Sequence, residues 1–175
     1  VFGSPRWVAD PVMIAKGGAP LLQKQAVGAL LSLVVPKAYL LTPNMPEAAA
    51  LMGRNVETLD DMKRAADFLM EHGANAVLLK GGHGDQDILY DLLATGSGFT
   101  VFESVRVESV HTHGTGCTLA SAISTYLARG SALEPACEAA INYVQKAIRA
   151  APRLGQGHGP LGHMAGETPI LERSD

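Results

Sequence analysis

Several features that mark particular classes of protein are scarce or missing in this sequence. Its 175 residues include two cysteines, Cys117 and Cys137, too few for a disulfide framework and typical of a reducing cytoplasm. The longest apolar run, residues 26–35, is interrupted by Gly28 and Ser32 and is too short to span a membrane. A net charge of -3 without basic clusters argues against a nucleic-acid partner and an acidic membrane surface. We find no signal peptide, internal repeat or low-complexity segment.

The composition is otherwise that of a globular domain. Hydrophobic residues make up 47% of the chain and charged residues 18%, which provides material for a sizeable core. The length suits a single domain. The chain starts at Val1 rather than Met and soon enters an apolar strand, so we expect it to be the C-terminal part of a longer protein.

Short apolar runs that alternate with helical patterns predict a layered α/β domain with a largely parallel sheet. We expect three buried strands, at residues 7–9, 38–41 and 76–79, and a hairpin of two more at 88–93 and 99–107. Apolar residues at helical spacing predict helices over residues 22–34, 45–51, 59–72, 117–129 and 133–148. Thr58 with Asp61 fits a capping box, and Ser131 is the expected N-cap of the last helix.

Residues 111–118, HTHGTGCT, lead directly into one of these helices. Two glycines beside a threonine leave backbone N–H groups accessible at a helix N-terminus, where they lack intrahelical partners and the helix dipole adds positive charge. This pattern predicts an anion site, most often for phosphate, with Cys117 in the first turn, where thiols ionise more readily. The same residues equally fit a glycine-rich turn that merely begins a helix, with Cys117 a small buried hydrophobic residue.

Polar residues follow the three expected parallel strands. Asp10 follows the first, Asn44 and Glu47 the second, and Lys80 the third. Because the carboxyl ends of parallel strands lie along one edge of a sheet, we expect these side chains to gather there. Carboxylates, a lysine and an anion-binding helix end suit a nucleoside triphosphate with a divalent metal.

Five motifs occur in order along the chain: DPVM at 10–13, TPNMPEA at 42–48, KGGH at 80–83, HTHGTGC at 111–117 and GHGP at 157–160. In this combination the chain resembles the hydroxymethylpyrimidine/phosphomethylpyrimidine kinases of thiamin biosynthesis, members of the ribokinase-like superfamily. The resemblance runs from about Val8 to His163 and covers only about the C-terminal two-thirds of a family member. It implies a layered α/β/α fold, here without the N-terminal segment that recognises the pyrimidine.

The resemblance also implies roles for individual residues. Cys117 takes the position of the general base that accepts the proton of the substrate hydroxymethyl group. Gly114, Thr115 and Gly116, with the Cys117 amide, take that of the anion hole for the transferred γ-phosphoryl group. The residues implied at ATP are Thr42, Asn44, Lys80 and Gly81, and those implied at Mg²⁺ are Asp10 and Glu47.

Simpler explanations exist for several of these residues. Asp10 before a proline could cap a turn, and Asn44 with Glu47 could cap a helix. Lys80 could be a solvated charge at a strand end.

The histidines and the second cysteine are harder to assign. His111 and His113 are two residues apart, which on a strand places them on one face. Without a third ligand, we favour a structural or hydrogen-bonding role over a metal pair. We assign no role to His83, His158 or His163, and we expect Cys137 in the core.

These observations lead us to expect that residues 1–163 form the ATP-binding and catalytic part of a ribokinase-like domain, with residues 164–175 as a loose tail. The implied activity is ATP-dependent phosphorylation of 4-amino-5-hydroxymethyl-2-methylpyrimidine and its monophosphate in the cytoplasm, with Mg²⁺ as cofactor. The alternatives are a pyridoxal- or pyridoxine-type kinase of the same superfamily and a non-catalytic nucleotide-binding remnant. Expected partners are ATP and the pyrimidine, without nucleic acid or membrane, and family members are often homodimers.

Overall fold

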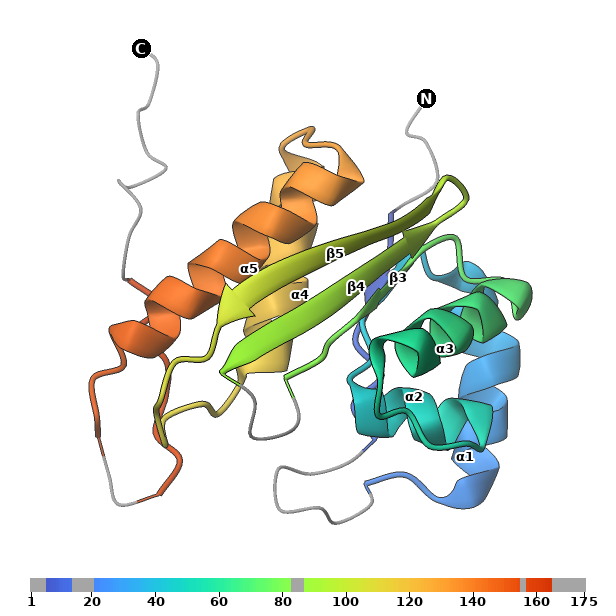
Figure 1. Ribbon diagram of the computed structural model, residues 1–175, viewed down its shortest axis with the longest axis horizontal. Helices are drawn as coiled ribbons and strands as arrows, with labels where there is room; N and C mark the ends of the chain where they lie inside the picture. The colour runs from blue at the N-terminus through green and yellow to red at the C-terminus, as the bar shows by residue number, and fades with distance from the viewer. Residues whose placement is uncertain (1–5, 14–20, 83–86, 155–156, 165–175) are drawn as a thin grey trace.

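The structure is a computed structural model that describes residues 6–13, 21–82, 87–154 and 157–164. A five-stranded sheet is covered on one face by α1 (Lys24–Ala29), α2 (Met45–Met52) and α3 (Leu59–Glu71), and on the other by α4 (Thr115–Ala128) and α5 (Leu133–Arg149) (Figure 1). The expected layered α/β/α arrangement is confirmed. The loop expected at 15–20, His83 and the tail after Met164 lie outside the described residues.

The sheet has the strand order β1-β2-β3-β4-β5. β1 (Val8–Ala9), β2 (Leu40–Leu41) and β3 (Val77–Leu79) are parallel neighbours, whereas β4 (Ile88–Thr95) is antiparallel to both β3 and β5 (Gly98–Val105). β5 therefore runs in the direction of β1, β2 and β3, and the sheet is largely parallel as predicted. β4 and β5 form the predicted hairpin, with both strands extending further into the expected loop.

Two hydrophobic cores form on the two faces of the sheet, because successive side chains of a strand point to opposite faces. Leu41 and Val77 pack in the core beneath α2 and α3, and Leu40 and Leu78 in the core beneath α4 and α5. β2 and β3 are buried on both faces, which explains their uninterrupted apolar sequences. Burial of each such leucine contributes about 1.5–3 kcal/mol, so these short central strands hold the two helical layers together.

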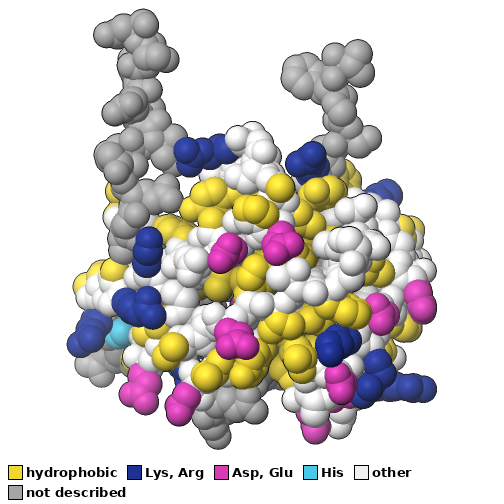
Figure 2. Space-filling model, turned by 45° about the horizontal axis from the view of Figure 1, so that its top comes forward, with side chains coloured by type: hydrophobic (Ala, Val, Ile, Leu, Met, Phe, Trp, Pro, Cys, Tyr) yellow, Lys and Arg dark blue, Asp and Glu magenta, His cyan; other side chains and the backbone are white. Residues whose placement is uncertain are grey.

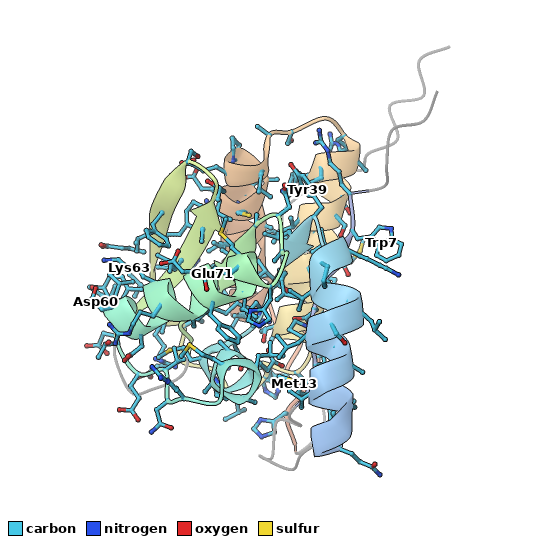
Figure 3. The ribbon with its side chains drawn as sticks, turned by 90° about the vertical axis from the view of Figure 1, so that its right-hand side faces the viewer. Trp7, Met13, Tyr39, Asp60, Lys63 and Glu71 are labelled. Atoms are coloured by element: carbon cyan, nitrogen blue, oxygen red, sulfur yellow. The ribbon has the colours of Figure 1, made fainter. Side chains whose placement is uncertain are left out.

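The predicted capping box begins α3. Thr58 Oγ1 accepts the Asp61 N–H at 3.2 Å, and Asp61 Oδ2 accepts the Thr58 N–H at 2.9 Å. Hydrogen bonds from the Thr58 side chain and backbone hold the pKa of Asp61 well below its usual range. Asp60 and Lys63 form an exposed ion pair of 3.1 Å on the same helix (Figure 3). The polar residues of the first turns of α3 thus stabilise the helix itself.

The expected helix over residues 22–34 is not one regular α-helix. α1 ends at Ala29 and is followed by a π-helical turn, η1 (Leu30–Val34), and a 3-10 turn, η2 (Val35–Lys37). Pro36 has no N–H, and in an α-helix its ring would clash with the carbonyl of Ser32. Regular α-helical hydrogen bonding therefore cannot continue through this turn.

The prediction that Ser131 caps the last helix is also wrong. The N-cap of α5 is Ala132, which supplies no side-chain hydrogen bond. The Ser131 N–H donates to Tyr126 O at 3.0 Å, after Gly130 adopts a left-handed φ of 92°. Ser131 therefore belongs to the end of α4 rather than to the start of α5.

The surface carries mixed side chains. On the face shown in Figure 2, Lys and Arg side chains are scattered around the rim rather than gathered in one patch. Trp7 is 51% exposed and points away from the body of the protein (Figure 3). Among the helices of the described residues, none combines the length and the apolar character that crossing a membrane requires.

Candidate active site

The carboxyl ends of the parallel strands bring Asp10, Thr42 and Lys80 together. These residues directly follow β1, β2 and β3, whose register pairs Ala9 with Leu41 and Leu41 with Val77. The Lys80 N–H donates to Pro43 O at 2.8 Å and extends the parallel pairing by one bridge. Polar residues from three separate stretches of sequence thus meet at one sheet edge.

Asp10 and Lys80 form an ion pair with 2.9 Å between Oδ1 and Nζ. The Lys80 side chain is 14% exposed and that of Asp10 13%, so the pair is shielded from water. Thr42 is fully buried and its hydroxyl donates to the same Asp10 oxygen at 3.1 Å, so it supports Asp10 rather than facing the surface. The simpler explanations, a turn cap and a solvated lysine, are therefore wrong for Asp10 and Lys80.

Asn44 and Glu47 form a capping box at the start of α2. Asn44 Oδ1 accepts the Glu47 N–H, and Glu47 Oε2 accepts the Asn44 N–H, both at 2.8 Å. The helix-capping explanation is correct, but Glu47 is also only 3% exposed. Burial raises the pKa of the Glu47 carboxyl; the Asn44 N–H and the Lys80 charge oppose this rise, and the Asp10 charge adds to it. Glu47 therefore belongs to one electrostatic cluster with Asp10 and Lys80.

The glycine-rich turn begins α4 as predicted. Gly114 is the N-cap, and its left-handed φ of 82° favours glycine because other residues are strained there. The Thr115 hydroxyl donates to Thr112 O at 3.3 Å and stabilises the turn. Gly114 supplies no side chain to cap the helix, so the first N–H groups of α4 are available to an anion.

Gly116 lies directly against the ion pair. A Cβ atom on Gly116 would lie 3.2 Å from Lys80 Nζ and 3.4 Å from Asp10 Oδ2. The first turn of α4 thus faces the end of β3 and the end of β1. This approach joins the predicted anion site to the cluster of charged strand ends.

The two cysteines have opposite environments. Cys117 is exposed on the first turn of α4, so its interpretation as a small buried hydrophobic residue is wrong. Cys137, on α5, is fully buried in the core that α4 and α5 form with the sheet, as expected. Burial, with smaller effects of the Asp91 and Glu134 charges, raises the pKa of the Cys137 thiol to about 12. Only Cys117 offers a thiol to a ligand.

Sequence reasoning missed Asp91, which supports Lys80 from β4. Asp91 Oδ1 accepts the N–H of Gly81, a residue implied at ATP by the resemblance, at 2.9 Å, so this N–H is engaged within the protein. Burial raises the pKa of Asp91, and the hydrogen bond from Gly81 and the Lys80 charge oppose this rise. Gly81 lies so close to β4 that a Cβ would be 1.9 Å from Tyr90 O. A single carboxylate inside the apolar run at 88–93 was the available signal.

Two histidines, His111 and His113, lie close before Gly114 in the sequence. His111 and His113 lie beyond the end of β5, so the condition for a metal pair on one strand face is not met. His111 Nδ1 accepts the Gly159 N–H at 3.1 Å, which agrees with the favoured hydrogen-bonding role. No group of three His, Cys, Asp or Glu residues within the described ranges is arranged to hold a metal ion.

The donor set at the sheet edge nevertheless fits Mg²⁺. This ion keeps several of its waters and needs only one or two protein carboxylates together with phosphate oxygens. Asp10 and Glu47 supply such oxygens, and Lys80 is the cation that acts on both carboxylates. The α4 N-terminus beside them is suited to an anion. Together these groups could hold a metal-bound phosphate ester.

Comparison with known proteins agrees with this chemistry. A family model described as Phosphomethylpyrimidine kinase matches residues 2–162. The chain is 44% identical over 174 residues to a hydroxymethylpyrimidine/phosphomethylpyrimidine kinase of Bacillus subtilis, covering 99% of this chain and 64% of that protein. It is 49% identical over 170 residues to the thiamine biosynthesis bifunctional protein ThiED of Geobacter sulfurreducens, covering 95% of this chain and 34% of that protein. The chain therefore spans less than two-thirds of the length of these relatives.

Solved structures share the fold. The pyridoxal kinase of Staphylococcus aureus in complex with AMP-PCP has a TM-score of 0.83 and 36% identity, covering 90% of this chain and 57% of that one. An ADP complex of Bacillus subtilis pyridoxal kinase has the same TM-score and identity, covering 90% and 60%. The phosphomethylpyrimidine kinase of Clostridium difficile 630 has a TM-score of 0.69 and 39% identity, covering 81% and 56%. Each alignment includes most of this chain.

Proposed function

Because the chain belongs to the phosphomethylpyrimidine kinase family, we propose that it forms the catalytic part of an ATP-dependent kinase that phosphorylates 4-amino-5-hydroxymethyl-2-methylpyrimidine and its monophosphate. The observation that carries the proposal is the approach of α4 to the ion pair, with a Cβ on Gly116 only 3.2 Å from Lys80 Nζ. Phosphoryl transfer depends mainly on positioning and on stabilisation of charge. The N–H groups of the α4 N-terminus, with the Lys80 ammonium and the Asp10 carboxylate beside Gly116, supply both.

In this proposal the N-terminus of α4 acts on ATP, and Cys117 acts on the substrate hydroxyl that receives the phosphoryl group. The N–H groups of residues 114–117 bind the oxygens of the γ-phosphoryl group, and Lys80 binds the phosphates from the sheet side. The substrate hydroxyl oxygen attacks the γ-phosphorus, its proton passes to the Cys117 thiolate to form the thiol, and the bond between the γ-phosphorus and the bridging oxygen breaks to release ADP. The exposure of Cys117 supports this role, because a general base must be reachable by the substrate.

Asp10 and Glu47 would hold Mg²⁺, which, when bound, neutralises charge on the triphosphate. Thr42 and Asn44 support these carboxylates, Thr42 through its hydroxyl and Asn44 through its N–H. The burial of Glu47 and its raised pKa favour a cation at this position, because a second positive charge would relieve the cost of ionisation. We place the reaction in the cytoplasm, which suits two free thiols.

Substitution of Cys117 tests the proposal in the full gene product. We expect Cys117→Ala to lower kcat by about 100-fold or more, a typical contribution of a general base, with the KM for ATP little changed. Cys117→Asp replaces the thiol with a carboxylate that can also accept a proton and is expected to retain part of the turnover. Undiminished turnover in Cys117→Ala would exclude the thiol as the base.

A pyridoxal-type kinase is the second candidate function. It is favoured by the two pyridoxal kinase structures, each at a TM-score of 0.83 and 36% identity. Measuring kcat/KM for the hydroxymethylpyrimidine and for pyridoxal with the same preparation decides between them. Nucleotide binding without phosphorylation of either compound would instead support a non-catalytic nucleotide-binding protein.

A further inference from the structure

Residues 158–163, called here the clasp segment, have no part in the proposed reaction, yet they are bound to both ends of the glycine-rich turn. Contacts before the turn are made to Val110 and His111, and the contact after it is made to Thr118. The turn between these points, residues 112–117, carries the anion site and Cys117. The clasp segment thus contacts the chain on both sides of the residues on which the proposed chemistry depends.

The clasp segment donates both hydrogen bonds before the turn. His158 Nδ1 lies 2.8 Å from Val110 O, and because a carbonyl only accepts, the proton is on that nitrogen. The Gly159 N–H donates to His111 Nδ1 at 3.1 Å, so this second nitrogen must carry a lone pair. His158 therefore donates from its ring and Gly159 from its backbone, and Val110 and His111 accept.

Gly159 is required for this contact. A Cβ on Gly159 would lie 2.5 Å from His111 Nδ1 and 2.8 Å from Leu154 O. Any side chain at this position would push the clasp segment away from His111. The GHGP motif therefore has a steric reason for its second glycine.

The contact after the turn is anchored on α5. Thr118, which directly follows Cys117, has its Oγ1 3.1 Å from His163 Nε2. The His163 carbonyl accepts the Tyr143 hydroxyl at 2.8 Å, and the Gly162 N–H donates to Ala147 O at 2.9 Å. Since α5 packs along α4, the clasp segment holds the first turn of α4 to a rigid neighbour.

The turn needs such external support. It contains two glycines, and its N-cap has no side chain with which to fix the start of the helix. An anion hole is effective only when its N–H groups are held in place before the reaction. We infer that the clasp segment positions residues 112–117 for phosphoryl transfer, with His111 as the positioning residue that accepts the Gly159 N–H. This inference rests on the proposed function, because it concerns the same reaction.

Substitutions of His111 separate its hydrogen bond from its bulk. His111→Phe keeps an aromatic ring without an acceptor, whereas His111→Asn keeps an acceptor atom near the position of Nδ1. In the full gene product we expect His111→Phe to lower kcat about tenfold with an unchanged KM for ATP, because a misaligned turn weakens transition-state more than ground-state binding. His111→Asn is expected to retain most of the wild-type kcat.

Hydrogen–deuterium exchange provides a readout that needs no substrate. The Thr118 N–H, which donates to Gly114 O at 2.9 Å, reports whether the first turn of α4 is formed. We expect faster exchange of residues 118–121 in His111→Phe and also in Gly159→Ala, which breaks the same contact from the other side. The matched control is His72→Phe at the C-cap of α3, which removes a 2.7 Å contact of His72 Nδ1 with Phe68 O. His72 is far in the sequence from both the clasp segment and the glycine-rich turn. This variant should leave kcat and this exchange unchanged.

The outcomes distinguish this inference from the proposed function. Wild-type exchange of residues 118–121 in both His111→Phe and Gly159→Ala would overturn the positioning role, as would equal loss of kcat in the Phe and Asn variants. A wild-type protein that phosphorylates neither compound would overturn the proposed function. If the wild-type protein is inactive, faster exchange in the two variants, without the same effect in His72→Phe, would still support the contact between the clasp segment and the turn.

Discussion

Adding a single methyl group at Gly116 should lower kcat while leaving the free energy of unfolding nearly unchanged. Gly116 is the second residue of α4, and its backbone lies over the ion pair of Asp10 and Lys80. In Gly116→Ala the new Cβ would lie 3.2 Å from Lys80 Nζ and 3.4 Å from Asp10 Oδ2. An unstrained contact is about 3.5–4.0 Å, so the ammonium or the turn must shift by a few tenths of an ångström.

The expected effects on stability nearly cancel. Alanine is more favourable than glycine in a helix by about 0.5–1 kcal/mol, and the displaced lysine end loses a comparable amount. We therefore expect the free energy of unfolding to change by less than about 1 kcal/mol. The effect on activity should be larger. Misplacement of reacting groups by about 1 Å can lower a rate 100-fold, so a shift of a few tenths should lower kcat about tenfold.

Gly28→Ala is the matched control for this experiment. Gly28 lies in α1, and no atom would come within 4 Å of its Cβ. This variant should gain about 0.5–1 kcal/mol of stability from helix propensity and keep the wild-type kcat. Urea denaturation measures the stabilities, and a coupled assay of ADP release measures kcat.

Two results would refute this reasoning. A wild-type kcat in Gly116→Ala would mean that the first turn of α4 does not lie at the reacting phosphate. A loss of more than about 3 kcal/mol of unfolding free energy would mean that Gly116 is needed for packing, because such losses are typical of cores and buried polar networks.

Three further predictions follow from burial and capping. In the folded protein iodoacetamide should modify the exposed Cys117 and leave Cys137, whose pKa is raised to about 12; mass spectrometry of both sites checks this. Asn44→Ala should lower the free energy of unfolding by about 2 kcal/mol, because it leaves the buried Glu47 N–H without a partner. Thr58→Ala, at the exposed capping box, should lower it by only about 1 kcal/mol. Equal losses for the two variants in urea denaturation would contradict this prediction. The pKa of Glu47 is raised in the folded state. Protonated Glu47 therefore stabilises the fold fully at a pH below the pKa of this group in the unfolded chain, and this stabilisation is lost as the pH rises through its pKa in the folded protein. The urea midpoint of wild type relative to Glu47→Gln should therefore fall with rising pH, and a constant difference would count against the raised pKa.

Features that depend on neighbouring residues were predicted well from the sequence. The capping box of Thr58 and Asp61 forms, and the glycine-rich turn begins α4 with Gly114 at a left-handed φ of 82°. Both involve contacts within about one helical turn, where propensity and hydrogen bonding act directly. The apolar runs of β2 and β3 likewise predicted buried parallel strands.

Features that depend on how elements meet were predicted less well. Ser131 has the chemistry of an N-cap, but the end of α4 holds its N–H, so Ala132 starts α5 instead. The sequence left Cys117 either at an anion site or buried as a small hydrophobic residue, and the packing of α4 leaves it exposed. Asp91 lies in an apolar run, and only the pairing of β3 with β4 shows that it binds the Gly81 N–H.

The sequence by itself determined which residue types stand at the strand ends and that a glycine begins α4. It did not determine which of them touch. Asp10 and Lys80 are 70 residues apart, and His111 and Gly159 are 48 apart. Local propensity acts over a turn or two, whereas these contacts exist because the parallel strand order aligns carboxyl ends and because α5 packs on α4. The ion pair beneath Gly116 and the clasp on His111 were therefore decided by the tertiary structure.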